Sequence, residues 1–206
     1  MIMPSRNLAL VVLSTLCFFA IARPAPARAE GLSLNLDPTQ STVGFTLGAF
    51  LHTVKGTFAL KQGTITFDSA TGQAGGNVVI DLASGQSGDV KRDANMKNNV
   101  LQVETYPFAV FTPNRVQGKL VNGTRSELDV DGMLAIHGAS HAMTLHVMVD
   151  TKGTSMTATT QFSVPYVQWG MKDPSTFLLH VGNTVDVAVA AVGQVHPLSG
   201  NASAQP

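Results

Sequence analysis

Alternation of apolar and polar residues is the feature of this sequence that most constrains its fold. Within the segment 41–48, Val43, Phe45 and Leu47 share one parity, and threonine and glycine occupy the positions between them. Such alternation over about four to eight residues indicates a β-strand with one buried face. The chain therefore needs an interior that receives one face of each such strand.

The same alternation recurs along the chain, and turn signals separate the runs. Glycine-rich pairs such as Gly75-Gly76 and Asn122-Gly123 mark turns. Many short strands joined by tight turns, without helices between them, are typical of an all-β antiparallel sandwich or barrel. Apolar residues of one parity are found at Ile65 and Phe67, at Met156, Ala158, Phe162 and Val164, and at Val185, Val187 and Val189.

One stretch lacks the alternation, and it predicts a single short helix near residues 89–98. The stretch is polar, and either Ser87 or Asp89 fits the N-cap position. Beyond it, Pro107 and Pro113 bracket the next strand. Because proline cannot donate a backbone hydrogen bond, we expect that strand to be short or to lie at a sheet edge.

Residues 1–29 are predicted to be a secretory signal peptide. Arg6 precedes an apolar run from Leu8 to Ile21, and Ala27 and Ala29 supply small residues at the expected cleavage site. The apolar run is shorter than the roughly 20 residues that a membrane-spanning helix needs. We therefore expect cleavage near Ala29, a periplasmic or secreted location and no stable membrane span afterwards. An uncleaved anchor is the alternative.

The rest of the chain is predicted to form one domain, residues 30–194, followed by a disordered tail, residues 195–206. Loss of the leader would remove Cys17, the single cysteine, so the core alone would hold the domain. The leader holds three arginines and no acidic residue, in a chain with 13 residues of each charge sign. The remaining acidic excess and the lack of a basic run argue against a nucleic-acid partner.

Three of the six histidines lie close together in the sequence, at His137, His141 and His146. A four-residue spacing suits a metal site on a helix, but Gly138 falls inside the interval and alternating runs flank it. The pattern instead predicts a hairpin that turns at 138–140, with His137 and His146 pointing away from its apolar face. We interpret them as surface histidines and expect no metal. Ligation across the hairpin remains the alternative.

No arrangement of residues predicts catalysis. A serine hydrolase would need a G-x-S-x-G turn, and the Gly-Gln-Ser-Gly segment at 85–88 lacks that spacing. Asp129 and Asp131 share a strand face with the pattern of a solvated one, whereas acid–base catalysis needs a perturbed pocket. We therefore expect no enzyme activity, no catalytic residue and no cofactor.

Several blocks of the sequence, in their order along the chain, resemble the YceI-like family. They read QSTVGFTLGAFLHTVKGTF, IDLASGQSGDVKRDANMKNNVLQVETYPFAVF, DGMLAIHGASHAMTLHV and VQWGM, and the similarity runs from about Leu34 to Val192. This resemblance implies a lipocalin-like antiparallel β-barrel of about eight strands. It also implies an exported protein that binds a polyisoprenoid or related lipid threaded through the barrel.

Some positions depart from the family's usual pattern. Asn95 stands where the family commonly has histidine, Gly48-Ala49 replaces a His-Leu pair, and Gln168 and Trp169 replace Asp and Phe. These departures leave the expected fold unchanged. They leave the identity of the lipid and of its head group open.

A barrel of this kind favours a ligand with a long apolar tail. Each buried CH₂ contributes about 0.8 kcal/mol, so some fifteen of them offset an association cost of about 4–15 kcal/mol. The alternatives are a stress-related or structural periplasmic module without a stoichiometric ligand and, less favoured, a metal-dependent enzyme. The candidate lining residues are Phe45, Leu47, Phe58, Phe67, Met96, Phe108, Leu134, Ile136, Phe162, Trp169 and Phe177.

Arg92 is the candidate contact for a ligand head group. Its guanidinium suits an anionic group such as a carboxylate or phosphate. The alternative is a surface ion pair with Asp93 or Glu104, which are close in the sequence. We expect a long-chain lipid or isoprenoid as the partner of the cavity, and the sequence indicates no protein partner.

Overall fold

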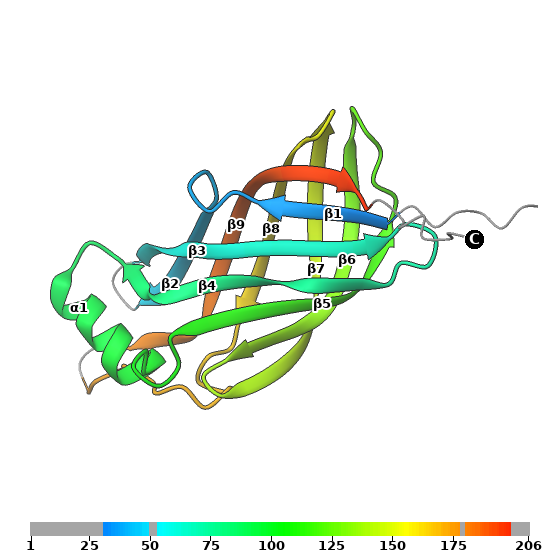
Figure 1. Ribbon diagram of the computed structural model, residues 1–206. Helices are drawn as coiled ribbons and strands as arrows, with labels where there is room; N and C mark the ends of the chain where they lie inside the picture. Colours follow the sequence, from blue (N-terminus) through cyan, green and yellow to red (C-terminus); the bar gives the residue numbers. More distant parts are fainter. Residues whose placement is uncertain (1–30, 50–52, 178–179, 199–206) are drawn as a thin grey trace, which may run out of the picture.

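The chain folds into a closed antiparallel β-barrel with one helical segment at one end (Figure 1). The computed structural model describes residues 31–49, 53–177 and 180–198. The predicted all-β, lipocalin-like barrel is confirmed, and closure excludes the sandwich. The strands are β1 (Gly31–Leu36), β2 (Thr42–Ala49), β3 (Thr53–Asp68), β4 (Ala74–Gln86), β5 (Phe108–Gly118), β6 (Arg125–Ile136), β7 (Ala139–Lys152), β8 (Ser155–Val164) and β9 (Val181–Pro197).

Nine strands fill eight positions around the barrel because β1 and β2 share one of them. β1 pairs with β3 and β9 over one half of their length, where Asn35 lies opposite Thr64. β2 pairs with the same two strands over the other half, where Val43 lies opposite Phe58. The loop between β1 and β2 turns out of the wall, as Figure 1 shows. This agrees with the expected number of about eight strands.

The connections between strands gather at two ends of the barrel. The helical end carries the segment 87–107 between β4 and β5, the β6–β7 turn and the segment 165–177 that follows β8. The opposite end carries the β3–β4, β5–β6 and β7–β8 connections. Strand pairing between β4 and β5 covers only 78–81 against 108–111. At the helical end β4 therefore extends beyond the start of β5, and the helical segment connects the two strands there.

The predicted helix is present and is longer than expected. α1 (Val90–Asn95) continues directly into η1 (Met96–Leu101), a π-helical turn. Asp89 is the N-cap, and its side chain accepts a hydrogen bond from the Arg92 backbone N–H at 2.8 Å. That bond holds the pKa of the Asp89 carboxyl below its usual range. The segment reaches the core through η1, where Val100 and Leu101 are buried.

Two local expectations are wrong. The strand between the prolines is neither short nor at an edge, because β5 runs through Pro113 and lies between β4 and β6. The register shifts between Pro113 and Arg115, so a β-bulge accommodates the missing N–H. The β6–β7 turn consists of His137 and Gly138, with φ of 51° and 78°, rather than residues 138–140. Positive φ at both positions is the geometry of a tight type I′ hairpin.

The described residues begin at Gly31 and end at Leu198. The expected signal peptide, residues 1–29, lies outside the described residues, as does the tail beyond residue 198. β9 continues to Pro197, three residues into the expected tail, and Val195 pairs with Leu34 of β1. Among the residues that the structure describes, no helix is both long and apolar enough to span a bilayer.

Candidate functional site

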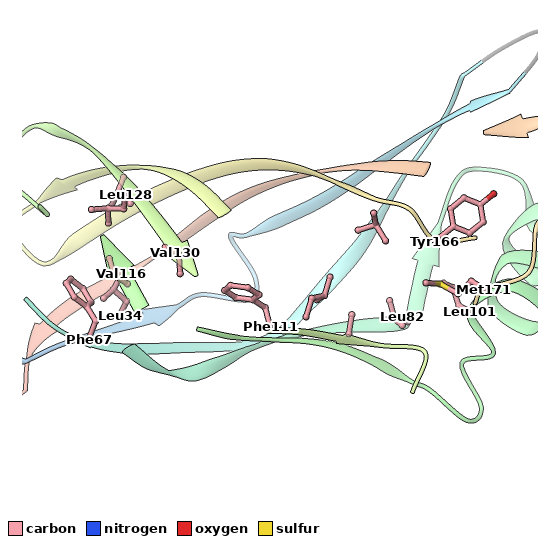
Figure 2. Packing of buried hydrophobic residues seen from close by; sticks show 14 of the residues in the cluster. Leu34, Phe67, Leu82, Leu101, Phe111, Val116, Leu128, Val130, Tyr166 and Met171 are labelled. Atoms are coloured by element: carbon pink, nitrogen blue, oxygen red, sulfur yellow. The ribbon is translucent and has the colours of Figure 1, made fainter. Parts of the chain in front are cut away.

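The barrel encloses a cavity of about 660 Å³ that side chains from all nine strands and from the helical segment line. This volume lies within the range of roughly 300–1,000 Å³ for ligand pockets. Figure 2 shows Leu34, Phe67, Val116 and Leu128 gathered at one side of the view and Tyr166 and Met171 at the other. Residues of both groups line the cavity, so it extends along the barrel.

The two ends of the cavity differ in exposure. At the opposite end, the lining residues Val116, Leu128 and Met156 are each less than a tenth exposed. At the helical end, the lining includes Asn95 and Thr176, which are exposed to solvent. The cavity is therefore closed by apolar packing at the opposite end and reaches the surface at the helical end.

Arg92 carries the only charge among the residues that line the described cavity. Its Nε donates to Ser87 Oγ at 2.7 Å and its Nη2 donates to the Ser87 carbonyl at 2.8 Å. Ser87 in turn donates through its backbone N–H to Asp93 Oδ1 at 2.8 Å. The expected alternative, a direct ion pair with Asp93 or Glu104, is absent from the described part of the chain.

These contacts fix the guanidinium at the mouth of the cavity. Two of its nitrogens are held by Ser87, while Nη1 has no hydrogen-bond partner among the described residues. Asn95, another lining residue, lies one helical turn further along α1. The helical end thus combines one cation, one amide and hydroxyl groups at the entrance to an otherwise apolar interior.

Tyr166 is a second polar residue at the helical end. It is only 5% exposed, and its hydroxyl donates to the Gly182 carbonyl at 2.7 Å. Burial, with a smaller contribution from the nearby Asp173 carboxylate, raises the pKa of the Tyr166 hydroxyl to about 12. The phenol therefore stays neutral in the folded protein well above neutral pH. It ties the segment after β8 to the start of β9.

Most of the predicted lining residues do face the cavity. Phe45 and Phe58 contact each other with ring centroids 5.1 Å apart. Because the cavity lies inside the barrel, the alternation that predicted strand faces also predicted these positions. The predicted residues that line the cavity are Phe45, Leu47, Phe58, Phe67, Met96, Leu134, Ile136 and Phe162.

Three predicted lining residues lie elsewhere. Phe108 has the wrong parity, because the inward residues of β5 are Ala109 and Phe111, and the Lys61 ammonium lies over the Phe108 ring. Trp169 stacks on His141 outside the cavity lining, with centroids 3.8 Å apart. Phe177 is 95% exposed at the helical end.

Sequence reasoning missed several polar residues that line the cavity, and Thr160 is one of them. Thr160 has the same parity as Met156, Ala158, Phe162 and Val164, so the alternation itself places it inside. It was passed over because its side chain is polar. Parity taken without regard to polarity would have found it.

The histidines belong to no group of three or more His, Cys, Asp or Glu side chains among the described residues. His146 points away from the barrel interior as expected, 79% exposed, and its Nδ1 lies 2.5 Å from Asp129 Oδ1. His137 lies in the turn and its ring contacts Tyr106. His141 has inward parity at the end of β7, where the Trp169 ring covers it.

Asp129 and Asp131 lie on the outer face of β6, as their parity predicted. Asp131 accepts a hydrogen bond from Thr144 Oγ1 at 2.6 Å and one from the Gln117 side chain at 3.0 Å. Asp129 contacts His146. Both carboxylates are engaged with exposed polar neighbours rather than directed into the cavity.

Comparison of the sequence with family models identifies its relationship. The model of the YceI-like domain matches residues 34–192, which include all the strands from β2 to β8 and most of β9. No curated protein matches the chain.

Solved structures share the fold at low sequence identity. A polyisoprenoid-binding domain from Saccharophagus degradans has a TM-score of 0.65 and 20% identity, covering 79% of this chain and 98% of its own. BcnA from Burkholderia cenocepacia has a TM-score of 0.63 and 22% identity, covering 76% and 98%. The YceI protein of Campylobacter jejuni has a TM-score of 0.51 and 14% identity, covering 91% and 98%.

Proposed function

Because the chain belongs to the YceI-like family, we propose that it is an exported binding protein that holds one long-chain isoprenoid or related amphipathic lipid inside its barrel. The observation that carries this proposal is the cavity of about 660 Å³ with an apolar interior and a single charged side chain at its entrance. A structural neighbour that is a polyisoprenoid-binding domain supports it. In this proposal the protein sequesters or carries a lipid and does not catalyse a reaction.

The shape of the cavity suits an extended tail. On β8 the lining runs from Met156 to Val164, a distance of about 27 Å along the strand. Strands of a barrel tilt by roughly 35–45° from its axis, so the tail-binding part is about 20 Å deep. A compact polar metabolite would leave most of this apolar surface uncovered. A lipid tail covers it along its whole length.

The head group is proposed to lie at the helical end, beside Arg92. The opposite end is closed by buried apolar residues, whereas the helical end reaches solvent through Asn95 and Thr176. A head group with acceptor oxygens would receive hydrogen bonds from the guanidinium, and an anionic one would also gain the charge interaction. The ligand is therefore proposed to enter tail first.

Export is proposed from the sequence of residues 1–29. A charged start, an apolar run and small residues at 27 and 29 fit a signal peptide that is cleaved near Ala29. A lipid carrier in the periplasm or outside the cell would hold a water-insoluble ligand between membranes. Amino-terminal sequencing of the protein secreted by its native host tests this part, with Glu30 expected as the first residue.

The binding proposal is tested by filling the cavity. Ala158 lines the cavity on β8, two residues from Met156 at its closed end, and Ala188 is exposed on the outside of β9. We expect Ala158→Phe to lower the affinity of the delipidated protein for a fluorescent long-chain fatty acid at least tenfold, because the added ring occupies the path of the tail. Ala188→Phe adds the same ring outside and should bind as the unaltered protein does. Equal binding by both variants would contradict an interior site.

A further inference from the structure

Thr160 is a polar residue in the row of β8 side chains that faces the cavity. The other members of that row are Met156, Ala158, Phe162 and Val164, and all of them line the cavity. The residues on either side of it, Thr159 and Gln161, point outward and are exposed. A β-branched residue suits a strand, but valine would serve that purpose without placing a hydroxyl inside.

The hydroxyl of Thr160 has nothing to bind within the protein. Its Oγ1 is buried and has no hydrogen-bond partner among the described residues. By contrast, the buried Thr151 Oγ1 donates to the Val121 carbonyl at 3.2 Å, and the half-buried Ser41 Oγ accepts from the Val192 N–H at 3.1 Å. A buried hydroxyl without a partner is less favourable than an apolar group of the same shape.

The position of Thr160 is deep and apolar. It lies opposite Val147 of β7 and Val189 of β9, both of which line the cavity. Thr160 is four residues before Val164, the last residue of β8. It therefore lies about 13 Å along the strand from the helical end. A group that meets Thr160 is therefore part of the buried portion of the ligand and is distinct from the head group at Arg92.

We propose that the Thr160 side chain turns about its Cα–Cβ bond when a ligand binds, so that Oγ–H faces the cavity and donates a hydrogen bond to an oxygen atom carried within the buried part of the ligand. The ligand class is then an oxygenated long-chain lipid, with a carbonyl or similar acceptor along its chain, rather than a plain hydrocarbon tail. Thr160 is a specificity-determining residue on this view. The proposal rests on the proposed function, since it needs a lipid in the cavity, and it adds which lipids are preferred.

The test compares two variants of β8 with matched probes. Thr160→Val removes the hydroxyl and keeps the shape of the side chain, and Thr159→Val makes the same change on the outer face. The probes are stearic acid and oxo-stearic acids whose ketone stands near the carboxylate, in mid-chain or near the methyl end. Affinities are measured by displacement of a fluorescent fatty acid, and the thermal midpoint of each delipidated variant is recorded.

We expect the unaltered protein and Thr159→Val to bind one of the oxo-acids about five- to tenfold more tightly than stearic acid. In Thr160→Val this preference should disappear, while stearic acid binds at least as tightly as before. The delipidated Thr160→Val variant should melt no lower than the unaltered protein, because it loses an unpaired hydroxyl.

Four results would overturn the inference, and they are distinguishable. In the first, stearic acid binds but the unaltered protein prefers none of the oxo-acids. In the second, Thr160→Val keeps the preference. In both cases only the proposed role of Thr160 fails. A marked loss of stability in Thr160→Val would show that the hydroxyl has a partner in the protein. If no long-chain acid binds at all, the proposed function fails and the inference fails with it.

Discussion

Single residues supply the few polar groups that a mostly apolar cavity needs. Tyr166 is nearly buried, and its hydroxyl is committed to the Gly182 carbonyl. Arg92 is held by Ser87 at the mouth and keeps one side of its guanidinium available. Such positioned groups fix the orientation of a ligand whose binding energy comes from apolar contact.

The raised pKa of Tyr166 predicts a pH dependence of stability. The hydroxyl titrates at about 12 in the folded protein, against about 10 for an ordinary tyrosine. Its stabilising effect is therefore complete below pH about 10 and is lost as the pH rises towards 12. Tyr106 is the only other tyrosine, so tyrosinate absorbance in a Tyr106→Phe variant reports on Tyr166 alone. A titration midpoint near 10 in the folded variant would contradict the burial of the hydroxyl.

Arg92→Gln is expected to weaken the binding of long-chain acids about tenfold, because the charged partner of the carboxylate is lost. The affinity for a long-chain alcohol of equal length should change much less. Lys91 is an exposed cation on the same turn of α1, so Lys91→Gln is the matched control and should leave both affinities unchanged. Displacement of a fluorescent fatty acid measures each constant. An equal effect of the two substitutions would indicate a diffuse charge effect instead of a contact.

Glycine on β3 makes room for the aromatic pair of the cavity wall. A Cβ at Gly56 would lie 2.3 Å from Phe45 Cζ and 2.4 Å from the Gln86 carbonyl oxygen, whereas at Gly44 its nearest neighbour would be 3.7 Å away. Gly56→Ala is therefore expected to destabilise the protein by about 1–3 kcal/mol through overpacking. Gly44→Ala should change stability little. Urea unfolding of both variants measures the difference, and equal midpoints would be inconsistent with the packing described.

At the scale of strands, neighbouring strands of the barrel wall do not all pair along their full length. β7 pairs with β6 from Ala139 to Asp150 but with β8 only from Val147 to Lys152. Towards the helical end the two strands separate, and the segment after β8 returns to this region, where Trp169 stacks on His141. Side-chain packing there takes the place of backbone hydrogen bonds.

Hydrogen exchange should reveal this unpaired region between β7 and β8. Amides in the segment 139–146 that face β8 lack a strand partner, so peptides from this segment should exchange faster than those from 147–152. Trp169→Ala should accelerate exchange in 139–146 further, and it should leave 147–152 nearly unchanged. Gln168→Ala alters an exposed neighbour and serves as the control. Uniform protection along β7 would show that the strands stay paired in solution.

Sequence alternation predicted the strand faces well because parity along a strand depends only on local geometry. The lining at Phe45, Phe67 and Phe162 follows from it directly. The predictions for Phe108 and Phe177 are wrong because an apolar side chain need not face the interior: Phe108 has outward parity on β5 and Phe177 is exposed. The β-bulge at Pro113 and the one-residue offset of the β6–β7 turn depend on pairing between strands, which one sequence does not reveal.

For the molecule as a whole, closure of the sheet underlies both the stability of the barrel and the proposed function. Strand pairing continues around the barrel, with β1 and β2 together joining β3 to β9. Most inward residues are apolar, and they pack tightly at the barrel end that lies away from the helical segment. Towards the helical end they leave the cavity unfilled. The cavity is therefore a property of the barrel as a unit and needs no separate domain or metal to form it.

Native mass spectrometry of the protein purified from a host that supplies isoprenoid and acyl lipids tests this account most directly. The spectrum should show a complex of one protein with one long-chain amphiphile, which organic extraction removes and which rebinds to the refolded chain. Ala158→Phe should carry little or none of it. Protein that is folded, carries no long-chain species and takes up none from lipid vesicles would contradict the account.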